Sequence, residues 1–173
     1  MKTLLAFSVL TTCLVFLSFK IPSIKSIKKH QNNIECDSIP LLNKQIIDFV
    51  KTKIKKKVGR GECWDLAYEA LELTKATWDG KYKYGNEMTV EHDCIFPGDI
   101  IQFENIVLKY TMDGREYKEK MSHHTAIIYE VKGKGDFILA HQNTSFTGRK
   151  VGLSPLDLKN VIKGKFKIYQ PVK

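Results

Sequence analysis

Hydrophobic residues in the first half of the chain recur every three or four positions, which is the spacing of amphipathic α-helices. A helix is predicted to open at Ser38-Ile39-Pro40, with Ser38 as its cap and Pro40 in the first turn. A second helix is predicted over residues 63 to about 76. The apolar faces consist of Leu42, Ile46, Phe49, Val50 and Ile54 in the first helix, and of Leu66, Ala67, Ala70, Leu71 and Leu73 in the second.

The second half of the chain carries β-branched and alternating apolar runs that are typical of strands. Strands are predicted over residues 100–111, 116–131, 137–143 and 165–169, and the first two form a hairpin at Asp113-Gly114. Ser154-Pro155-Leu156-Asp157 predicts the start of a short helix. Helices followed by an antiparallel meander predict an α+β fold, with the N-terminal helices packed on an antiparallel β-sheet.

The N-terminus predicts the compartment. Residues 4–19 are almost wholly apolar and follow Lys2, so residues 1–22 are expected to be a signal peptide or an N-terminal anchor. Residues 23–37 form a polar connector, and residues 38–173 form the domain. The protein is therefore expected to be exported: periplasmic, secreted, or attached to a membrane through its N-terminus.

Cysteine usage fits an exported chain. Cys13 lies in the leader, so Cys36, Cys63 and Cys94 remain, an odd number that suggests one pair and one free thiol. We expect a disulfide between Cys36 and Cys94, which an oxidising compartment permits, with Cys63 left free.

Composition and net charge limit the classes of binding partner that we expect for this protein. At 173 residues, 43% apolar and 27% charged, the chain fits one globular domain, expected to be a monomer, plus a targeting segment. A net charge of +9 favours anionic polymers or membrane surfaces. The lysines form no recognisable nucleic-acid motif, so no nucleic acid is expected as a partner. No cofactor motif is present, and His92-Asp93-Cys94 lacks a second ligand pair at metal-site spacing, so neither a cofactor nor a metal is expected.

Cys63 is the candidate nucleophile. It follows a turn with Gly59 and Gly61 and stands at the predicted start of a helix, where unpaired backbone N–H groups stabilise a thiolate. The flanking acids Glu62 and Asp65 act in the opposite direction, because nearby negative charge raises the pKa of a thiol. A buried structural cysteine remains the alternative interpretation.

Two adjacent predicted strands supply a base for this thiol. His124 begins a buried strand, and on the next strand Leu139, His141 and Asn143 share one face, while Ala140 and Gln142 face the other way. Asn143 is expected to accept the ring N–H of His124, with His141 as the competing orienting residue. His123 is expected to point away from His124.

Three segments carry a family resemblance: Gly61-Glu62-Cys63-Trp64, Pro97-Gly98-Asp99-Ile100-Ile101-Gln102-Phe103 and His124-Thr125-Ala126-Ile127-Ile128. Together they resemble the signatures of CHAP and NlpC-type cysteine peptidases, which are papain-like domains that cleave amide bonds. With His141-Gln142-Asn143 added, the chain is most similar to the cysteine-proteinase-fold domain of fungal actin-patch scaffold proteins and its bacterial relatives.

The resemblance implies a papain-like fold and a set of catalytic roles. Cys63 would be the nucleophile, His124 the base, and either Asn143 or His141 the third residue, with the Cys63 backbone N–H stabilising the oxyanion. The leading hypothesis is a thiol hydrolase acting on peptide or peptidoglycan-like substrate. The alternatives are a non-catalytic binding or scaffold module on the same fold, and an acyltransferase that uses the same Cys–His pair.

Overall fold

The computed structural model describes residue 36, residues 38–112 and residues 114–173. The predicted leader, Cys13 and the connector apart from Cys36 lie outside the described residues. Within the described residues, no helix is long and apolar enough to cross a membrane.

Two helices precede the sheet. Helix α1 spans Leu41–Lys53 and helix α2 spans Cys63–Thr74. The expected cap at Ser38 is wrong: Pro40 occupies that position, and its carbonyl accepts the N–H of Lys44 at 3.0 Å. Proline tolerates this place because a helix end leaves its first N–H groups unpaired in any case. Helix α2 ends where Lys75 turns into the left-handed region.

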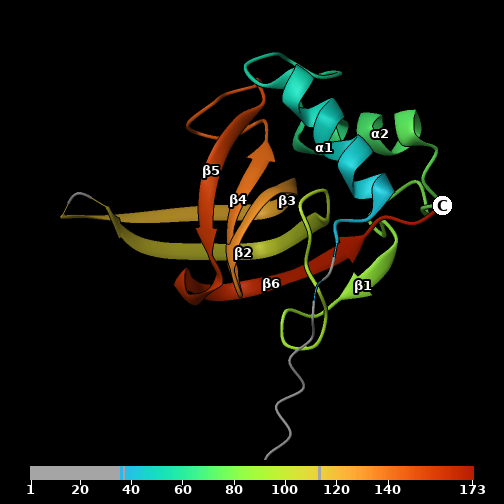
Figure 1. Ribbon diagram of the computed structural model, residues 1–173. Coiled ribbons are helices and arrows are strands. Elements are labelled where there is room, and N and C mark those ends of the chain that lie inside the picture. The colour runs from blue at the N-terminus through green and yellow to red at the C-terminus, as the bar shows by residue number, and fades with distance from the viewer. Residues whose placement is uncertain (1–35, 37, 113) are drawn as a thin grey trace, which may run out of the picture. The chain divides into compact units, whose positions relative to one another are not determined.

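The strands form one six-stranded antiparallel sheet in the order β1-β6-β2-β3-β4-β5 (Figure 1). The long hairpin of β2 and β3 extends beyond the other strands as a two-stranded arm. The short strand β1 was not among the strands predicted from the sequence. The strands are β1 (Asn86–Met88), β2 (Ile100–Met112), β3 (Arg115–Gly133), β4 (Asp136–His141), β5 (Gly152–Asp157) and β6 (Val161–Gln170).

The helix expected at Ser154-Pro155-Leu156-Asp157 is wrong, because these residues lie in strand β5. Among the described residues β5 is an edge strand that pairs with β4 alone, with Pro155 opposite Ile138. A proline is tolerated there because an edge strand needs hydrogen bonds on one side only. A helix cap does occur in this segment, but at Asp157, its last residue. The Asp157 carboxylate accepts the N–H of Lys159 at 2.9 Å and caps the short 3-10 helix η1 (Leu158–Asn160).

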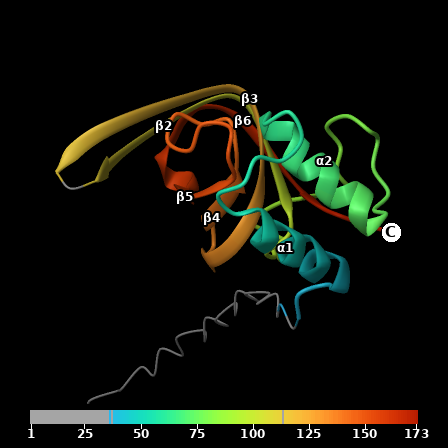
Figure 2. The same cartoon turned by 90° about the horizontal axis from the view of Figure 1, so that it is seen from above.

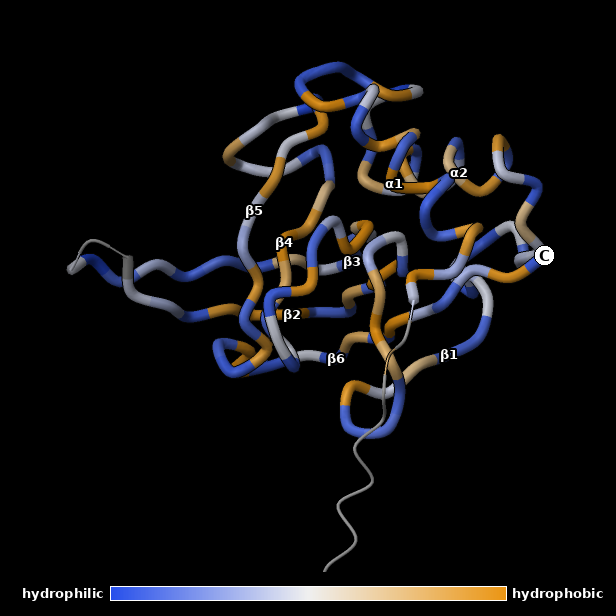
Figure 3. Tube along the Cα trace, viewed as in Figure 1, coloured by the Kyte–Doolittle hydropathy of each residue, from blue (hydrophilic) through white to orange (hydrophobic). Residues whose placement is uncertain are grey.

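Both helices cover the same face of the sheet, and the hydrophobic residues gather where they meet it (Figures 2 and 3). The other face has its own core. Helix η1 contacts β2 although two strands separate β5 from β2 in the sheet, so the sheet curls around this second core. The first core includes Ile46, Val50, Leu66, Leu71, Ile100 and Ile127, and the second includes Ile101, Phe103, Ile128, Phe137, Leu139 and Ile168. The expected α+β class, with N-terminal helices on an antiparallel sheet, is confirmed.

Candidate active site

Cys63 is the first residue of α2 and is half-buried, at the end of a sharply bent turn. Gly61 has a φ of 88°, and a Cβ atom there would lie 2.8 Å from the Cβ of Arg149. Only glycine combines this backbone conformation with such a close neighbour. The turn thus delivers the thiol to the N-terminus of a helix, as the sequence predicts.

Asp65 closes this turn. Its buried carboxylate accepts the backbone N–H groups of Arg60 at 2.7 Å and of Glu62 at 3.1 Å, and lies 3.2 Å from the Arg60 guanidinium. Burial alone would raise the pKa of Asp65, but the hydrogen bonds from Glu62 and Arg60 outweigh it and lower the pKa. The acid expected to act on Cys63 therefore serves to fix the loop that carries Cys63.

Gln142 holds the same turn from the sheet. Its fully buried amide accepts the N–H of Val58 at 3.1 Å and donates to the carbonyls of Val58 at 2.9 Å and of Glu62 at 2.8 Å. One side chain thus ties both ends of the turn to the end of β4. Sequence reasoning gave Gln142 no role. The sequence does contain an indication: Gln142 follows an apolar strand that is expected to be buried, and a buried amide side chain requires hydrogen-bond partners.

Asn143 lies beyond the end of β4 with a φ of 61°. The left-handed backbone breaks the alternation that would have put its side chain on the His141 face. Its amide nitrogen donates to the Glu62 carboxylate at 2.8 Å, and Arg149 binds the same carboxylate at 3.0 Å. In the described part of the chain no hydrogen bond joins Asn143 to His124.

The histidines form a chain of hydrogen bonds across three strands. His124 Nε2 on β3 lies 2.9 Å from His141 Nδ1 on β4, and His141 Nε2 lies 2.8 Å from the Ser154 hydroxyl on β5. Both rings are buried. The structure thus brings His141 to His124. Ser154 had been assigned to a helix, so sequence reasoning did not find it.

His123 lies apart from this chain. It is exposed, its Nδ1 lies 2.8 Å from the Glu104 carboxylate, and Tyr82 contacts its ring edge to face. Successive side chains of a strand point to opposite faces, which separates His123 from His124 as expected.

The thiol lies alongside the start of the buried part of β3. The backbone N–H of Thr125, the residue after His124, lies close enough to the Cys63 thiol to lower its pKa. A pocket of about 290 Å³ opens beside the two histidines. It is lined by residues 118–121 of β3, by His124 and His141, and by residues 143–146 of the loop after β4.

Burial controls the protonation of the site. It raises the pKa of Cys63, as does the charge of Glu62, against the opposing hydrogen bonds from the Thr125, Trp64 and Cys63 backbone N–H groups. Burial, and then the charge of a neighbouring histidine, lowers the pKa of His124 to about 4 and of His141 to about 3. At neutral pH the resting site therefore holds a protonated thiol and two uncharged imidazoles. The stabilised thiolate expected at the helix start is not its resting form.

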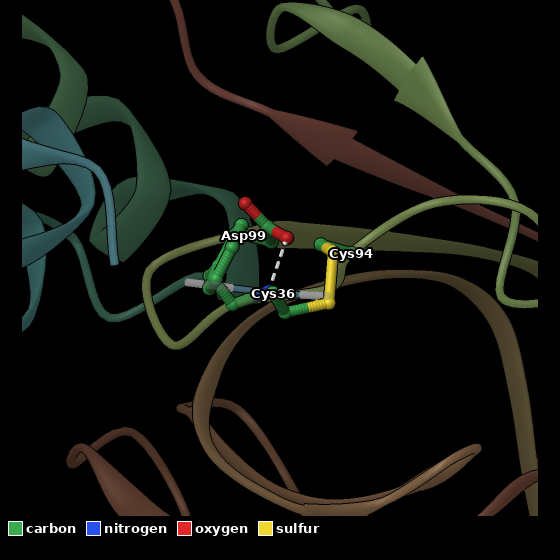
Figure 4. Close-up of a disulfide and its surroundings, with 4 residues drawn as sticks. Cys36, Cys94 and Asp99 are labelled. Atoms are coloured by element: carbon green, nitrogen blue, oxygen red, sulfur yellow. Dashed lines mark hydrogen bonds between the residues drawn. A yellow bond between two sulfur atoms is a disulfide. The ribbon is translucent and has the colours of Figure 1, made fainter. Parts of the chain in front are cut away.

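The expected disulfide joins Cys36 to Cys94, and Cys63 is a free thiol (Figure 4). Asp99 lies beside this disulfide. Its buried carboxylate accepts Asn43 Nδ2 at 2.7 Å and the Phe96 N–H at 2.8 Å, and burial raises its pKa to about 7. These contacts fasten α1 to the turn before β2, which makes Asp99 a structural residue. No cluster of three or more potential metal ligands occurs in the described part of the chain.

Known proteins share this sequence and arrangement to different extents. The altered inheritance of mitochondria protein 3 of Debaryomyces hansenii is 26% identical over 174 residues, covering 90% of this chain and 18% of that protein. The chain thus spans less than a fifth of that relative's length. The crystal structure of Ly7917 is 14% identical, with a TM-score of 0.45 over 73% of this chain and 62% of its own. The structure of Ly7917 with the hydrolyzing product of MDP is 13% identical, with a TM-score of 0.48 over 75% and 62%.

A family model gives the more extensive result. The model described as the AIM3/BBC1 cysteine proteinase-fold domain matches residues 41–173, which include both helices, all six strands and every residue of the candidate site. The family resemblance seen in the sequence is confirmed. The chain belongs to the AIM3/BBC1 cysteine proteinase-fold domain family, and its two helices and six-stranded sheet form a papain-like fold.

Proposed function

We propose that this protein is an exported thiol hydrolase that cleaves an amide bond, with cell-wall peptide as its substrate class. One observation carries the proposal. Cys63, at the N-terminus of α2, lies close enough to the Thr125 N–H for that group to lower its pKa, and His124, the residue before Thr125, is joined through His141 to Ser154. A nucleophile, a base and an orienting residue are the parts that covalent amide hydrolysis requires.

The hydrogen-bond chain assigns a role to each ring nitrogen. His124 Nε2 is engaged by His141, so Nδ1 is left to take a proton from the thiol. This requires His124 to donate its Nε2–H to His141 Nδ1, and His141 in turn to donate its Nε2–H to the Ser154 oxygen. A serine hydroxyl accepts such a bond readily.

The reaction then proceeds in two stages. The Cys63 sulfur attacks the carbonyl carbon while its proton passes to His124 Nδ1, and the oxyanion accepts the Cys63 backbone N–H. The C–N bond breaks, and His124 gives the proton to the leaving amine. Water, losing a proton to His124, attacks the thioester carbonyl and releases the acid and the Cys63 thiol.

The resting protonation state makes this a general-base mechanism. The pKa of Cys63 is raised and that of His124 is lowered to about 4, so the proton moves during attack on the substrate and not before it. Iodoacetamide, which reacts with a resting thiolate, should therefore label Cys63 slowly at neutral pH, and labelling should speed up only at a pH above that at which a free cysteine thiol ionises. The His124→Gln variant should show the same labelling profile while losing turnover.

The direct test measures turnover with full-length protein. Wild type is incubated with purified peptidoglycan and synthetic stem peptides, and newly formed amino groups are located by mass spectrometry. We expect cleavage by wild type and by His92→Gln, which removes an exposed histidine outside the site. We expect none by Cys63→Ala or by His124→Gln, with circular dichroism unchanged. Equal cleavage by Cys63→Ala would overturn the proposal.

The raised pKa of Cys63 is the observation that favours a binding or scaffold module instead. That function predicts no cleavage by wild type under any condition, together with saturable binding of the same peptides. An acyltransferase would give amide products when a free amine is added, which the same mass spectra detect.

The exported location is part of the proposal. The disulfide between Cys36 and Cys94 supports an oxidising compartment. Cell fractionation of the natural host, followed by alkylation of free thiols, tests it. Full-length protein found inside the cell with both cysteines reduced would contradict export.

A further inference from the structure

Two loops that are rich in basic residues lie side by side. One, residues 54–62, joins α1 to α2, and the other, residues 142–151, joins β4 to β5. Figure 1 shows both at the end of the molecule where β4 ends and β5 begins. Two backbone hydrogen bonds tie them together: the Lys55 N–H donates to the Val151 carbonyl at 2.8 Å, and the Val151 N–H donates to the Lys56 carbonyl at 2.9 Å. The two loops therefore form one continuous surface.

The positive charge of this surface is only partly balanced. The acids of the adjoining turn, Glu62 and Asp65, each have an arginine partner already. The Arg149 guanidinium lies 3.0 Å from the Glu62 carboxylate, and the Arg60 guanidinium lies 3.2 Å from the Asp65 carboxylate. Four further cations of the two loops are exposed and take part in no ion pair among the described residues: Lys55, Lys56, Lys57 and Lys150.

An apolar hollow of about 540 Å³ opens beside these lysines, and Lys55 and Lys150 are among its lining residues. Its apolar lining comes from Ile54, Val151 and Leu153, and the Leu153 side chain is 43% exposed. A lysine side chain can lay its methylene stem on apolar surface while its amino group stays in a polar layer. The four lysines and this hollow together form the lysine surface, which offers cationic groups and apolar contact in one place.

This combination fits the interface of a lipid bilayer better than it fits a soluble anionic polymer. A bilayer presents phosphate groups to the lysines and, just below them, acyl chains to Leu153. A soluble polymer of phosphates or carboxylates would pair with the lysines but would give the exposed Leu153 no apolar partner.

We propose that the lysine surface docks on a lipid bilayer that contains anionic lipids, with the four lysines binding lipid phosphates and Leu153 entering the boundary between headgroups and acyl chains. The contact is separate from the predicted N-terminal leader and does not require catalysis at Cys63. Because Val58, at the start of the Cys63 turn, directly follows Lys57, docking would hold that turn close to the membrane.

Vesicle binding tests the charge contribution. Full-length protein is titrated with vesicles of equal parts phosphatidylcholine and phosphatidylglycerol, and separately with vesicles of phosphatidylcholine alone. The readout is the preference for anionic over neutral vesicles, because an apolar leader would bind both kinds. We expect this preference to fall at least about ten-fold in a loop variant with four substitutions: Lys55→Gln, Lys56→Gln, Lys57→Gln and Lys150→Gln.

A control variant removes the same charge from exposed positions of β3 and β6, and it should lower the preference less than about three-fold. Circular dichroism should show that both variants keep the fold. Equal losses in the loop and control variants would overturn the proposal, as would equal binding of wild type to neutral and anionic vesicles. The control substitutions are Lys118→Gln, Lys120→Gln, Lys163→Gln and Lys165→Gln.

Insertion of Leu153 is tested by tryptophan fluorescence. We expect Leu153→Trp to gain an emission that phosphatidylglycerol brominated on its acyl chains quenches. Ile162→Trp, at a position of β6 that is 57% exposed, should show no more quenching than wild type. Absence of quenching at residue 153, with soluble polyphosphate bound as tightly as anionic vesicles, would assign the surface to an anionic polymer and overturn the proposal.

The docking proposal and the proposed hydrolase fail separately. Selective vesicle binding and quenching in a protein that cleaves no peptide would keep the membrane surface and reject only the hydrolase. Cleavage of soluble stem peptides by a protein without a preference for anionic vesicles would reject only the docking.

Discussion

The Cys63 turn (residues 58–65) and the outer arm of the β2–β3 hairpin (residues 109–112 and 114–120) are organised in opposite ways. Distant side chains reach the turn, among them Gln142 through three hydrogen bonds and Arg149 through Glu62. The arm depends on its own ladder, with an exposed ion pair of Lys109 and Glu116 at 2.8 Å. The turn is thus fixed before any ligand arrives, whereas the arm, which lies beyond the last β2–β6 pair at Leu108, is held among the described residues only by the pairing of β2 with β3. Rigidity is therefore concentrated where the chemistry is proposed.

The largest effect is expected from removing the Gln142 amide, which tests whether distant side chains hold the Cys63 turn in place. Gln142→Leu leaves the N–H and carbonyl of Val58 and the carbonyl of Glu62 without their buried partner. We expect a loss of about 3 kcal/mol in the free energy of unfolding, measured by urea denaturation. Gln45→Leu, on an exposed position of α1, is the control and should change it by less than about 0.5 kcal/mol. Equal effects of the two variants would mean that the turn does not depend on this amide.

The second largest effect is expected from acid, which should lower the free energy of unfolding through His124 and His141. The pKa values of His124 and His141 are lowered to about 4 and about 3, mainly by burial. The unfolded chain takes up protons on these rings near pH 6.5, so the free energy of unfolding falls as the pH drops from there toward 4. We expect His141→Asn to lose less stability over this window, by on the order of 2 kcal/mol.

The raised pKa of Asp99 acts in the opposite direction over the same window, since its protonated form favours the folded state. It is present in wild type and in His141→Asn alike, so the difference between the two denaturation series isolates the histidines. Parallel pH profiles of the two proteins would show that His141 is not held neutral by the fold.

Ser154 should have a smaller effect on stability and a specific effect on the site. Ser154→Ala removes the acceptor of the His141 Nε2–H, with a loss of about 1 kcal/mol in the free energy of unfolding. We expect turnover to fall about ten-fold, because 1.4 kcal/mol in a barrier corresponds to a factor of ten. Nitrogen NMR of His124 should show a mixture of ring tautomers in place of one.

Two serine variants sharpen this result. Ser154→Thr keeps the hydroxyl and should restore both turnover and the single tautomer. Ser122→Ala, at an exposed position of β3, should resemble wild type. An unchanged tautomer in Ser154→Ala would assign the orientation of His124 to His141 alone.

The smallest effect is expected in the arm. Removing the exposed ion pair by Lys109→Gln should change the free energy of unfolding by less than about 0.5 kcal/mol. A thermal denaturation series with Glu116→Gln and the double variant forms a mutant cycle. A coupling well above about 1 kcal/mol would indicate that the arm is as firmly held as the turn.

The sequence was sufficient for features that depend on long periodic patterns. Both helices, the central hairpin and the start of α2 at Cys63 follow from spacing and composition. The Cys36–Cys94 disulfide was expected from the number of cysteines outside the leader, and the structure contains it. The second core and the curl of the sheet were not predicted, because they depend on how separate strands meet.

The candidate site was predicted less completely, for reasons that lie in single residues. Asn143 leaves the expected face because its backbone is left-handed, which strand alternation does not anticipate. Ser154 was not predicted as a site residue because Pro155 led to the prediction of a helix start. Proline is typical of helix starts but is also tolerated on an edge strand. Asp65 was interpreted by its charge alone, whereas its hydrogen bonds to the turn decide its role.

Over residues 115–126, no strand among the described residues pairs with the side of β3 that faces away from β2, and this unpaired edge bears on the solubility of the protein. An exposed strand edge can pair with the same edge of another copy, which is a common route to aggregation. Lys118 and Lys120 would bring four positive charges together if two copies met edge to edge, and this repulsion favours separate molecules. These two lysines thus oppose edge-to-edge pairing between copies of the chain.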